Sequence, residues 1–294
     1  MKSQILKLGA LLLTPVLICS GLTGCGAKEK ENADLKYPSQ NYSYEETDSL
    51  QYDSWCRYDD AYLTRLREDY SLDQLVADCG TEFEKVQEVT EWVSNLWSHN
   101  GDNVPEQSDP LFILDSVTND GEQYRCVEYG VVISGCLNAL GIPSRTIGLK
   151  TQDVETRDYA AGHVTCEAYL KDYEKWVFID GQWGLIPIMG ETPLNAVQLG
   201  EVLQHPENYE ESLTFYSFLG ANGDQKDYRD WILEYLYYFD VTGYTRTADG
   251  FEETYIMLTP LESESPTVFQ IHYPLEIDIY THSVPQFYPK VKNV

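Results

Sequence analysis

The chain has 294 residues, of which 48 are acidic and 20 are basic, and its formal net charge at pH 7 is −28. Hydrophobic residues make up 43% of it and charged residues 23%, which agrees with a globular protein. So large an excess of negative charge opposes binding to nucleic acid and to an anionic membrane surface, because both partners are polyanions.

The first 24 residues have the composition of a signal peptide. Two lysines precede an apolar run from Leu8 to Leu22, which is too short for a comfortable membrane span. The run ends in Leu22-Thr23-Gly24-Cys25, which resembles a bacterial lipobox. Cleavage before Cys25 would make it the lipidated N-terminus, so we predict an extracytoplasmic protein that is lipid-anchored to the cell membrane. The alternative is an ordinary signal peptide that is cut nearby.

Residues 25–50 have the composition of a flexible tether. They are rich in Lys, Glu, Asn, Ser and Tyr and show no apolar period. We expect a random coil of about 25 residues that spans on the order of 25 to 30 Å. Removal of residues 1–24 takes away two lysines and no acid, so the net charge of the mature chain becomes −30. The lipid would then hold the protein at the membrane, since the surface charge opposes it.

Folded structure is predicted to begin near Gln51 with a helical part. Apolar residues recur there at helical spacing, and a loop with a glycine and two prolines separates the third helix from the fourth. Trp97 and His99 could border a cleft, although a surface position is the simpler interpretation for the histidine. The predicted helices are 60–69, 72–79, 82–97 and 111–117.

A buried helix is predicted from Cys126 to Leu140. Its apolar residues follow an alternating spacing of 4 and 3, and three valines widen the apolar face. Gly141 ends the helix as a left-handed cap, and Pro143 cannot continue the hydrogen-bond ladder. Cys126 therefore lies in the first turn, where free backbone N–H groups and the helix dipole stabilise a thiolate.

Three strands are predicted after this helix, and the second and third should form an antiparallel hairpin. The second strand alternates His163, Thr165 and Glu167 with apolar residues, and a short polar connection follows it. A four-residue loop makes His163 the diagonal neighbour of Asp180, whereas a two-residue loop pairs them directly. Both registers place the two side chains on one face of the sheet. The predicted strands are 144–150, 162–170 and 176–180.

Cys126, His163 and Asp180 together have the composition of a nucleophilic thiol site. Each residue also has a structural explanation. A cysteine in an apolar helix is commonly buried core, a strand histidine can be satisfied by its neighbours, and Asp180 before Gly181 can start a turn. The three residues indicate a site as a set rather than one by one.

The order of these residues, with Leu-Gly-Ile-Pro-Ser-Arg after the cysteine helix, resembles the transglutaminase-like branch of the papain-fold cysteine enzymes. Trp92-Val93 in the preceding helix fits the same pattern, and the similarity covers about residues 82–184. The resemblance implies an α+β, papain-like fold in which the cysteine helix packs on an antiparallel sheet. It also implies that Cys126 is the nucleophile, His163 the general base and acid, and Asp180 the residue that orients the histidine.

The second oxyanion donor of this family does not carry over to this sequence. Gln123 is too close to Cys126 to match the glutamine of papain-type enzymes, and Trp97 is a candidate for the aromatic donor of animal transglutaminases. No cofactor is implied, and no zinc-ligand spacing occurs. Five cysteines remain after processing, an odd number, of which Cys56 and Cys79 could form a disulfide.

Residues 185–294 form a C-terminal extension that should add to the sheet or flank of one domain, 51–294, whose core is about 82–184. Thr192-Pro193 has the pattern of a helix start, and Asp249-Gly250 indicates a hairpin turn. The extension is predicted to contain helices over 192–204 and 227–239, a hairpin over 244–259 and strand structure within 267–280.

The sequence predicts a cell-surface lipoprotein that acts on amide bonds of peptides or proteins, cell-wall peptide among them, through an acyl-enzyme. Transfer of the acyl group to water gives a peptidase or amidase, and transfer to an amine gives a transamidase. We favour hydrolysis slightly, because no acceptor site can be identified. The alternatives are a catalytically inactive transglutaminase-like surface binding module, and an enzyme held inactive by the extension lying over its cleft.

Overall fold

The structure is a computed structural model, and it describes residues 41–45, 50, 52–209, 212–217, 225–248 and 250–291. The predicted signal peptide, Cys25 and most of the predicted tether lie outside these residues. Within the described part of the chain, no helix is long and apolar enough to cross a membrane.

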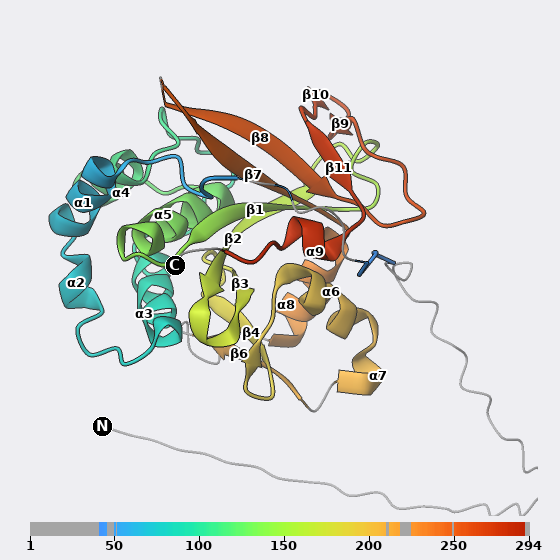
Figure 1. The fold of residues 1–294 in the computed structure, drawn as a ribbon, viewed down its shortest axis with the longest axis horizontal. Helices are drawn as coiled ribbons and strands as arrows, with labels where there is room; N and C mark the ends of the chain where they lie inside the picture. The colour runs from blue at the N-terminus through green and yellow to red at the C-terminus, as the bar shows by residue number, and fades with distance from the viewer. Residues whose placement is uncertain are drawn as a thin grey trace, which may run out of the picture. The chain divides into compact units, whose positions relative to one another are not determined.

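Helices form the N-terminal part of the described chain, as predicted, and Figure 1 shows them gathered beside the sheet. α3 begins with a capping box, in which Thr81 and Glu84 each accept from the other's backbone N–H. α2 ends four residues earlier than predicted, at Leu75, where the chain turns toward this cap. The helices are α1 (Asp60–Asp69), α2 (Leu72–Leu75), α3 (Glu82–Ser94) and α4 (Pro110–Asp120).

Helix α5 (Cys126–Ala139) begins at the predicted residue. Gly141 follows it with a φ of +79°, a conformation that favours glycine, so the predicted stop is confirmed. The helix lies directly on strand β2 (Gly162–Leu170), since a Cβ placed on Gly130 would come within 2.7 Å of the Thr165 carbonyl oxygen. Because Gly130 has no side chain, α5 can approach the sheet this closely.

Six strands form the main sheet, in the order β11-β8-β7-β1-β2-β3 (Figure 1). The hairpin of β2 and β3 is antiparallel, and Leu170 pairs with Lys175. The register with a four-residue loop is thus confirmed and the two-residue alternative is wrong. The loop holds the 3-10 turn η1 (Lys171–Tyr173). The strands are β1 (Ser144–Lys150), β2 (Gly162–Leu170), β3 (Lys175–Ile179), β7 (Tyr238–Thr247), β8 (Gly250–Leu258) and β11 (Ile279–Thr281).

The C-terminal extension supplies half of this sheet. β7 pairs with β1 through Gly148 and Asp240 and turns back into β8, as the hairpin signal predicted, although residue 249 lies outside the described residues. β11 pairs in parallel with β8. The other elements are β4 (Leu185–Met189), β5 (Thr192–Pro193), α6 (Ala196–Gln204), α7 (Pro206–Tyr209), β6 (Leu213–Ser217), α8 (Gln225–Ile232), η3 (Leu233–Tyr235), β9 (Val268–Phe269), β10 (Tyr273–Pro274) and α9 (Val284–Phe287).

Two predicted helices of the extension have wrong bounds. Thr192-Pro193 forms strand β5, which pairs with β4, and α6 begins only after Asn195, whose side chain accepts from Gln198 N at 2.9 Å. The helix predicted over 227–239 ends at Ile232, because Phe239 pairs with Leu149 in the main sheet. In both cases strand pairing overrides a local helix signal.

The packed chain also begins before Gln51, where the sequence placed its start. Tyr42 is buried among residues of the extension, and its hydroxyl donates to the Tyr237 carbonyl oxygen at 2.7 Å. Ser43 forms a parallel bridge with Ser283. The end of the predicted tether is therefore part of the folded body, because it buries an aromatic ring that a free coil would leave in water.

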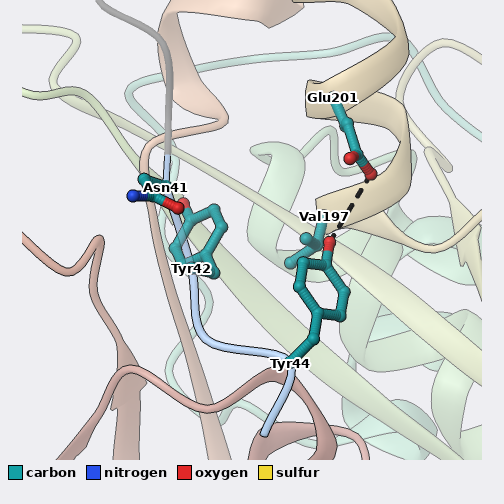
Figure 2. Close-up of a pocket in the computed structure, with 5 residues that line it drawn as sticks. All are labelled: Asn41, Tyr42, Tyr44, Val197 and Glu201. Carbon is teal, nitrogen blue, oxygen red and sulfur yellow. Dashed lines mark hydrogen bonds between the residues drawn. The ribbon is translucent and has the colours of Figure 1, made fainter.

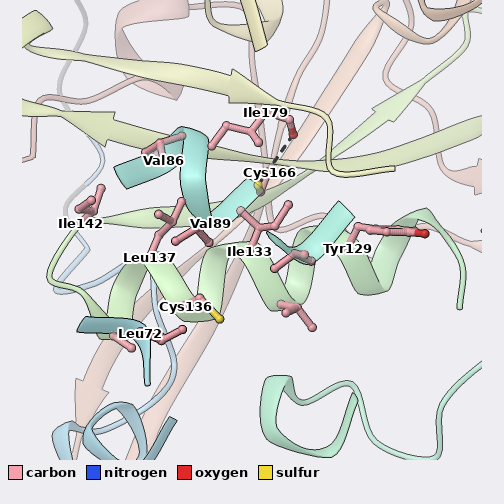
Figure 3. Packing of buried hydrophobic residues seen from close by; sticks show 14 of the residues in the cluster. Leu72, Val86, Val89, Tyr129, Ile133, Cys136, Leu137, Ile142, Cys166 and Ile179 are labelled. Atoms are coloured by element: carbon pink, nitrogen blue, oxygen red, sulfur yellow. Dashed lines mark hydrogen bonds between the residues drawn. The ribbon is translucent and has the colours of Figure 1, made fainter. Parts of the chain in front are cut away.

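Strand β2 separates two hydrophobic cores. Its residues Cys166, Ala168 and Leu170 face α5 and the N-terminal helices, and Figure 3 shows Cys166 beside Ile133 of α5. The alternate residues His163 and Glu167 point to the opposite face, where the extension packs over the sheet. The sheet thus has one face covered by the core and one covered mainly by the extension.

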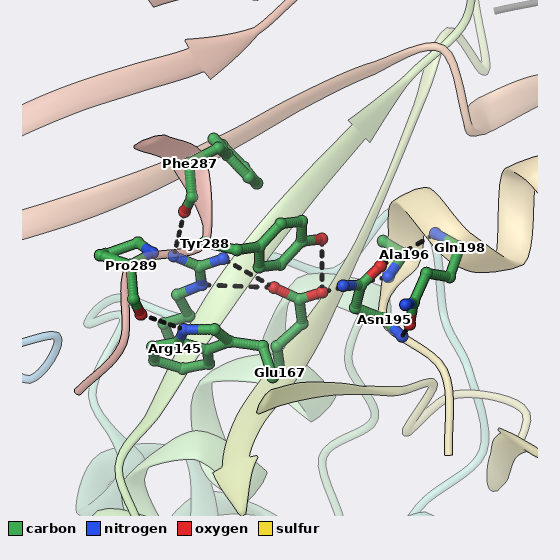
Figure 4. Close-up of polar contacts among 9 residues, drawn as sticks. Arg145, Glu167, Asn195, Ala196, Gln198, Phe287, Tyr288 and Pro289 are labelled. Carbon is green, nitrogen blue, oxygen red and sulfur yellow. Dashed lines mark hydrogen bonds and ion pairs between the residues drawn. The ribbon is translucent and has the colours of Figure 1, made fainter. Parts of the chain in front are cut away.

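A buried ion pair ties the extension to this second face (Figure 4). Arg145 on β1 and Glu167 on β2 are direct partners, and Arg145 Nη2 lies 2.9 Å from Glu167 Oε2. Arg145 Nη1 also donates to the Phe287 carbonyl oxygen at 3.1 Å. Glu167 Oε1 accepts from the Tyr288 hydroxyl at 2.8 Å and from Ala196 N at 3.2 Å. Three separate segments therefore meet at one carboxylate.

Candidate active site

Cys126 lies at the start of α5, in its first turn, and is half-buried. The turn before it is fixed by Glu128, which is fully buried and accepts from Arg125 N at 3.1 Å. The Arg125 guanidinium pairs with the same carboxylate at 2.8 Å. These contacts hold the helix start, and with it the backbone of Cys126, in place.

His163 and Asp180 lie in contact, as the strand register requires. His163 Nε2 is 2.9 Å from Asp180 Oδ2, and the side chains are 3% and 0% exposed. Asp180 follows the last residue of β3, and its backbone pairs with Leu185 in both directions. Its other oxygen, Oδ1, accepts from Trp183 N at 3.2 Å. The tight turn after β3 therefore fixes both the backbone and the side chain of Asp180.

The side chains of His163 and Cys126 each shift the pKa of the other, so the structure brings the three predicted residues close together. Since Nε2 is taken by Asp180, the other ring nitrogen is the one left for the sulfur. Burial lowers the pKa of His163, but the charge and hydrogen bond of Asp180 and the contact with Cys126 outweigh it and raise this pKa to about 9.

Burial raises the pKa of the Cys126 thiol, but hydrogen bonds from His163 and His99, the His163 charge and the Val164 N–H outweigh it and lower this pKa to about 6. The pair is consequently a thiolate and an imidazolium between about pH 6 and pH 9. A preformed thiolate is the nucleophilic form of cysteine.

His99 was interpreted from the sequence as a surface histidine. It is exposed, but its side chain interacts with Cys126 and lowers the pKa of that thiol. The next residue, Asn100, donates its N–H to the Tyr124 carbonyl oxygen at 2.9 Å, which ties the loop to the residues just before the cysteine. The sequence around His99 does not indicate this contact, because His99 and Cys126 are 27 positions apart and meet only when the loop between them closes.

Aromatic residues of the extension cover the histidine. The Trp231 ring meets the His163 ring edge-on, with the centroids 4.9 Å apart, and Tyr235 lies 6.2 Å away. The Tyr228 hydroxyl donates to Asp180 Oδ2 at 3.0 Å. All three were predicted only as part of an aromatic helix, since the residue types do not show what the helix packs against.

Trp97 is placed near the start of α5 by stacking on Tyr129, one turn after Cys126. The ring centroids are 4.1 Å apart, and the Tyr129 hydroxyl donates to the Trp97 carbonyl oxygen at 2.8 Å. The indole Nε1–H of Trp97 is buried and has no hydrogen-bond partner among the described residues. Gln123, the other candidate for an oxyanion donor, is exposed.

Other polar features of the described chain do not involve Cys126, His163 or Asp180. No group of three or more His, Cys, Asp or Glu side chains in the described part of the chain could hold a metal ion. Cys56 and Cys79 are both free thiols. A pocket of about 150 Å³ lies where residues 41–44 meet α6, and Figure 2 shows the Tyr44 hydroxyl pointing at Glu201 across it, 3.5 Å from Oε2.

Residues 71–181 match the family model of the transglutaminase-like superfamily. A search of the curated proteins gives no match. Among solved structures, a candidate cysteine protease from Cytophaga hutchinsonii is 18% identical, with a TM-score of 0.32 and coverage of 43% of this chain and 39% of that one.

Two further solved structures are similar over part of the chain. A TGase is 20% identical, with a TM-score of 0.28 and coverage of 42% of this chain and 31% of that one. A candidate protease from Parabacteroides distasonis is 18% identical, with a TM-score of 0.27 and coverage of 43% and 30%. The chain thus spans less than half the length of each of the three structures.

Proposed function

Because residues 71–181 belong to the transglutaminase-like superfamily and form part of an α+β fold, we propose that the protein is a thiol enzyme acting on amide carbonyls of peptides or proteins. The observation that carries the proposal is the position of the His163 ring, whose Nε2 lies 2.9 Å from Asp180 Oδ2 and whose pKa is raised also by Cys126. An imidazole held in this way can keep the cysteine ionised and then serve as an acid.

In the proposed reaction the Cys126 thiolate attacks the amide carbonyl carbon. The oxyanion that forms accepts from the backbone N–H of Cys126. His163 gives its proton to the leaving amine, the C–N bond breaks, and a thioester remains on Cys126. Asp180 holds the ring in place throughout.

The thioester is then attacked by water or by a second amine, from which neutral His163 takes a proton. Water yields a carboxylic acid and free thiol, as in a peptidase or amidase, and an amine yields a new amide, as in a transamidase. We favour hydrolysis of peptides, cell-wall peptide among them, because no acceptor site can be identified beside Cys126.

The location is proposed from the sequence, since Cys25 lies outside the described residues. A lipid on this cysteine would tether the enzyme outside the cytoplasm. Replacing Cys25 with Ala should move the protein from the membrane fraction to the soluble fraction. Retention of the variant in the membrane fraction would instead favour an uncleaved or differently attached N-terminus.

The thiol site is tested by measuring the rate of iodoacetamide alkylation of Cys126 against pH, in the full-length chain and in His163→Ala, with the modified cysteine identified by peptide mapping. We expect the wild-type rate to titrate near pH 6, and the variant rate to titrate near or above the free-cysteine value of about 8.5. Buried Cys136 serves as the internal control, since burial raises the pKa of its thiol.

Titration of Cys126 near the free-cysteine value in both proteins would contradict the proposal and point to the non-catalytic binding module. An activated thiol would justify screening peptide amides, with and without an added primary amine, and separating hydrolysed from aminated products.

A further inference from the structure

Asp180 has a second side-chain partner that comes from outside the family match. Its Oδ2 atom forms two hydrogen bonds, one with His163 Nε2 at 2.9 Å and one from the Tyr228 hydroxyl at 3.0 Å. Tyr228 is 1% exposed and Asp180 is 0% exposed, so water does not compete for this oxygen. The charge of the carboxylate is therefore divided between a histidine and a phenol.

The phenol is held rigidly. Tyr228 lies on α8, and its ring meets Phe215 edge-on with the centroids 5.4 Å apart, while Trp183 lies at the same distance on another side. The next residue, Arg229, donates to the Leu213 carbonyl oxygen at 2.9 Å, which fixes α8 against β6. The hydroxyl consequently has one orientation available to it, toward Asp180.

We propose that Tyr228 is a positioning residue of the Cys126 site, which holds Oδ2 of Asp180 against His163 and takes up part of the charge of that carboxylate. This inference rests on the proposed function. A buried carboxylate whose only partner at this oxygen was the imidazolium would bind the ring proton more tightly. A neutral donor on the same oxygen weakens that hold, so the imidazolium stays acidic enough to protonate the leaving amine.

Tyr228 can act only as a neutral donor. Burial, followed by the charge of Asp180, raises the pKa of its phenol well above the ordinary value. Trp231 packs edge-on against the His163 ring and keeps water from it. The titratable groups that face the His163 and Asp180 pair are Cys126 and Cys166, Tyr228 and Tyr235.

The test is Tyr228→Phe in the full-length chain, because deleting the extension would remove strand β7, which pairs with β1. The matched control is Tyr288→Phe, which also removes a tyrosine hydroxyl from a buried carboxylate, Glu167, at 2.8 Å. The pKa of His163 is measured by NMR in protein labelled with 15N-histidine, with His163→Ala used for assignment. The pH profile of Cys126 alkylation is recorded in parallel.

We expect Tyr228→Phe to raise the pKa of His163 by about half a unit to one unit, since a hydrogen bond to the charged carboxylate has been removed. Tyr288→Phe should leave this pKa at the wild-type value. A His163 pKa in Tyr228→Phe that is equal to or below the wild-type value overturns the inference, provided that the wild-type protein shows the lowered Cys126 pKa. A wild-type protein without that lowered pKa contradicts the proposed function instead.

A second measurement covers the case in which Tyr228→Phe does not fold. Replacing tyrosine by 3-fluorotyrosine throughout the chain makes the phenols stronger donors while keeping their shape. The pKa of His163 should then fall relative to the unlabelled protein. In Asp180→Asn, the fluorinated and the unlabelled protein should have the same His163 pKa. An unchanged or raised His163 pKa would overturn the inference.

Discussion

Two buried charge pairs lie on the same face of β2 and are built alike. His163 pairs with Asp180, and four residues further along the strand Glu167 pairs with Arg145; the contact distance is 2.9 Å in both. Each carboxylate also accepts from a tyrosine hydroxyl that the extension supplies. The two pairs therefore share their strand, their burial and their dependence on residues far away in the sequence.

They differ in whether the cation can release its proton. The Arg145 guanidinium is always charged, and it lies over the Trp176 ring at 4.2 Å and over the Trp55 ring at 4.7 Å. His163 can change its protonation state and contacts a thiol. The same arrangement thus serves as a structural connection with arginine and as a proposed reactive site with histidine.

Removing the carboxylate of the arginine pair should have the largest effect. Glu167→Ala leaves the Arg145 charge buried and unpaired, so we expect a loss of about 3 to 5 kcal/mol in the free energy of unfolding, measured by urea denaturation. The control is Asp69→Asn, which breaks the exposed pair with Arg65 and should cost less than about 1 kcal/mol. Equal losses in the two variants would contradict the structural role of Glu167.

Neutralising the carboxylate of the histidine pair should change reactivity more than stability. In Asp180→Asn the imidazolium loses the charge that raises its pKa, so less thiolate forms on Cys126. We expect alkylation of Cys126 at pH 7 to slow by about two- to tenfold, in line with a rise of one to two units in the pKa of the thiol from about 6. Glu167→Gln, the same change in the other pair, should leave the alkylation rate of the folded protein unaltered.

His99 should have the smallest effect. It contacts Cys126 but is exposed and has no carboxylate partner comparable to Asp180 among the described residues. His99→Gln removes one of the hydrogen bonds that lower the pKa of Cys126, so its alkylation profile should move to higher pH by less than one unit. A shift as large as that of His163→Ala would mean that His99, and not His163, is the main partner of the thiolate.

The pH dependence of the wild-type site follows from the two shifted values. As the pH falls through about 6, the Cys126 thiolate takes up a proton and its reactivity is lost; as the pH rises through about 9, the His163 imidazolium gives up its proton. We expect alkylation at pH 5 to be about tenfold slower than at pH 7. Turnover of a substrate should fall on both sides of this window, because it needs the thiolate and the acid together.

Much of the site was predictable because its determinants are local. The spacing of apolar residues placed the start of α5 at Cys126, and the period of two put His163 on one face of β2. The length of the loop after Leu170 set the register that brings Asp180 beside that face. These features depend on residues close together in the chain, where backbone geometry leaves few alternatives.

Other features were decided only by the tertiary structure. Thr192-Pro193 has a helix-start pattern but pairs with β4, and Tyr42 ends in a core built from residues almost 200 positions away. Tyr228 reaches Asp180 across 48 residues. An aromatic residue buries its surface equally well against many partners, so its type does not say which one it meets.

The sequence by itself determined the secondary structure of the core, the face of each strand and the three residues of the candidate site, because periodicity and turn length act over a few residues. Only the packing of the extension decided that Tyr228 and Trp231 enclose the histidine, and only the closure of the loop at Asn100 onto Tyr124 decided that His99 lies near the thiol. Those contacts form when distant segments close on one another, and their geometry depends on the whole fold rather than on any one segment.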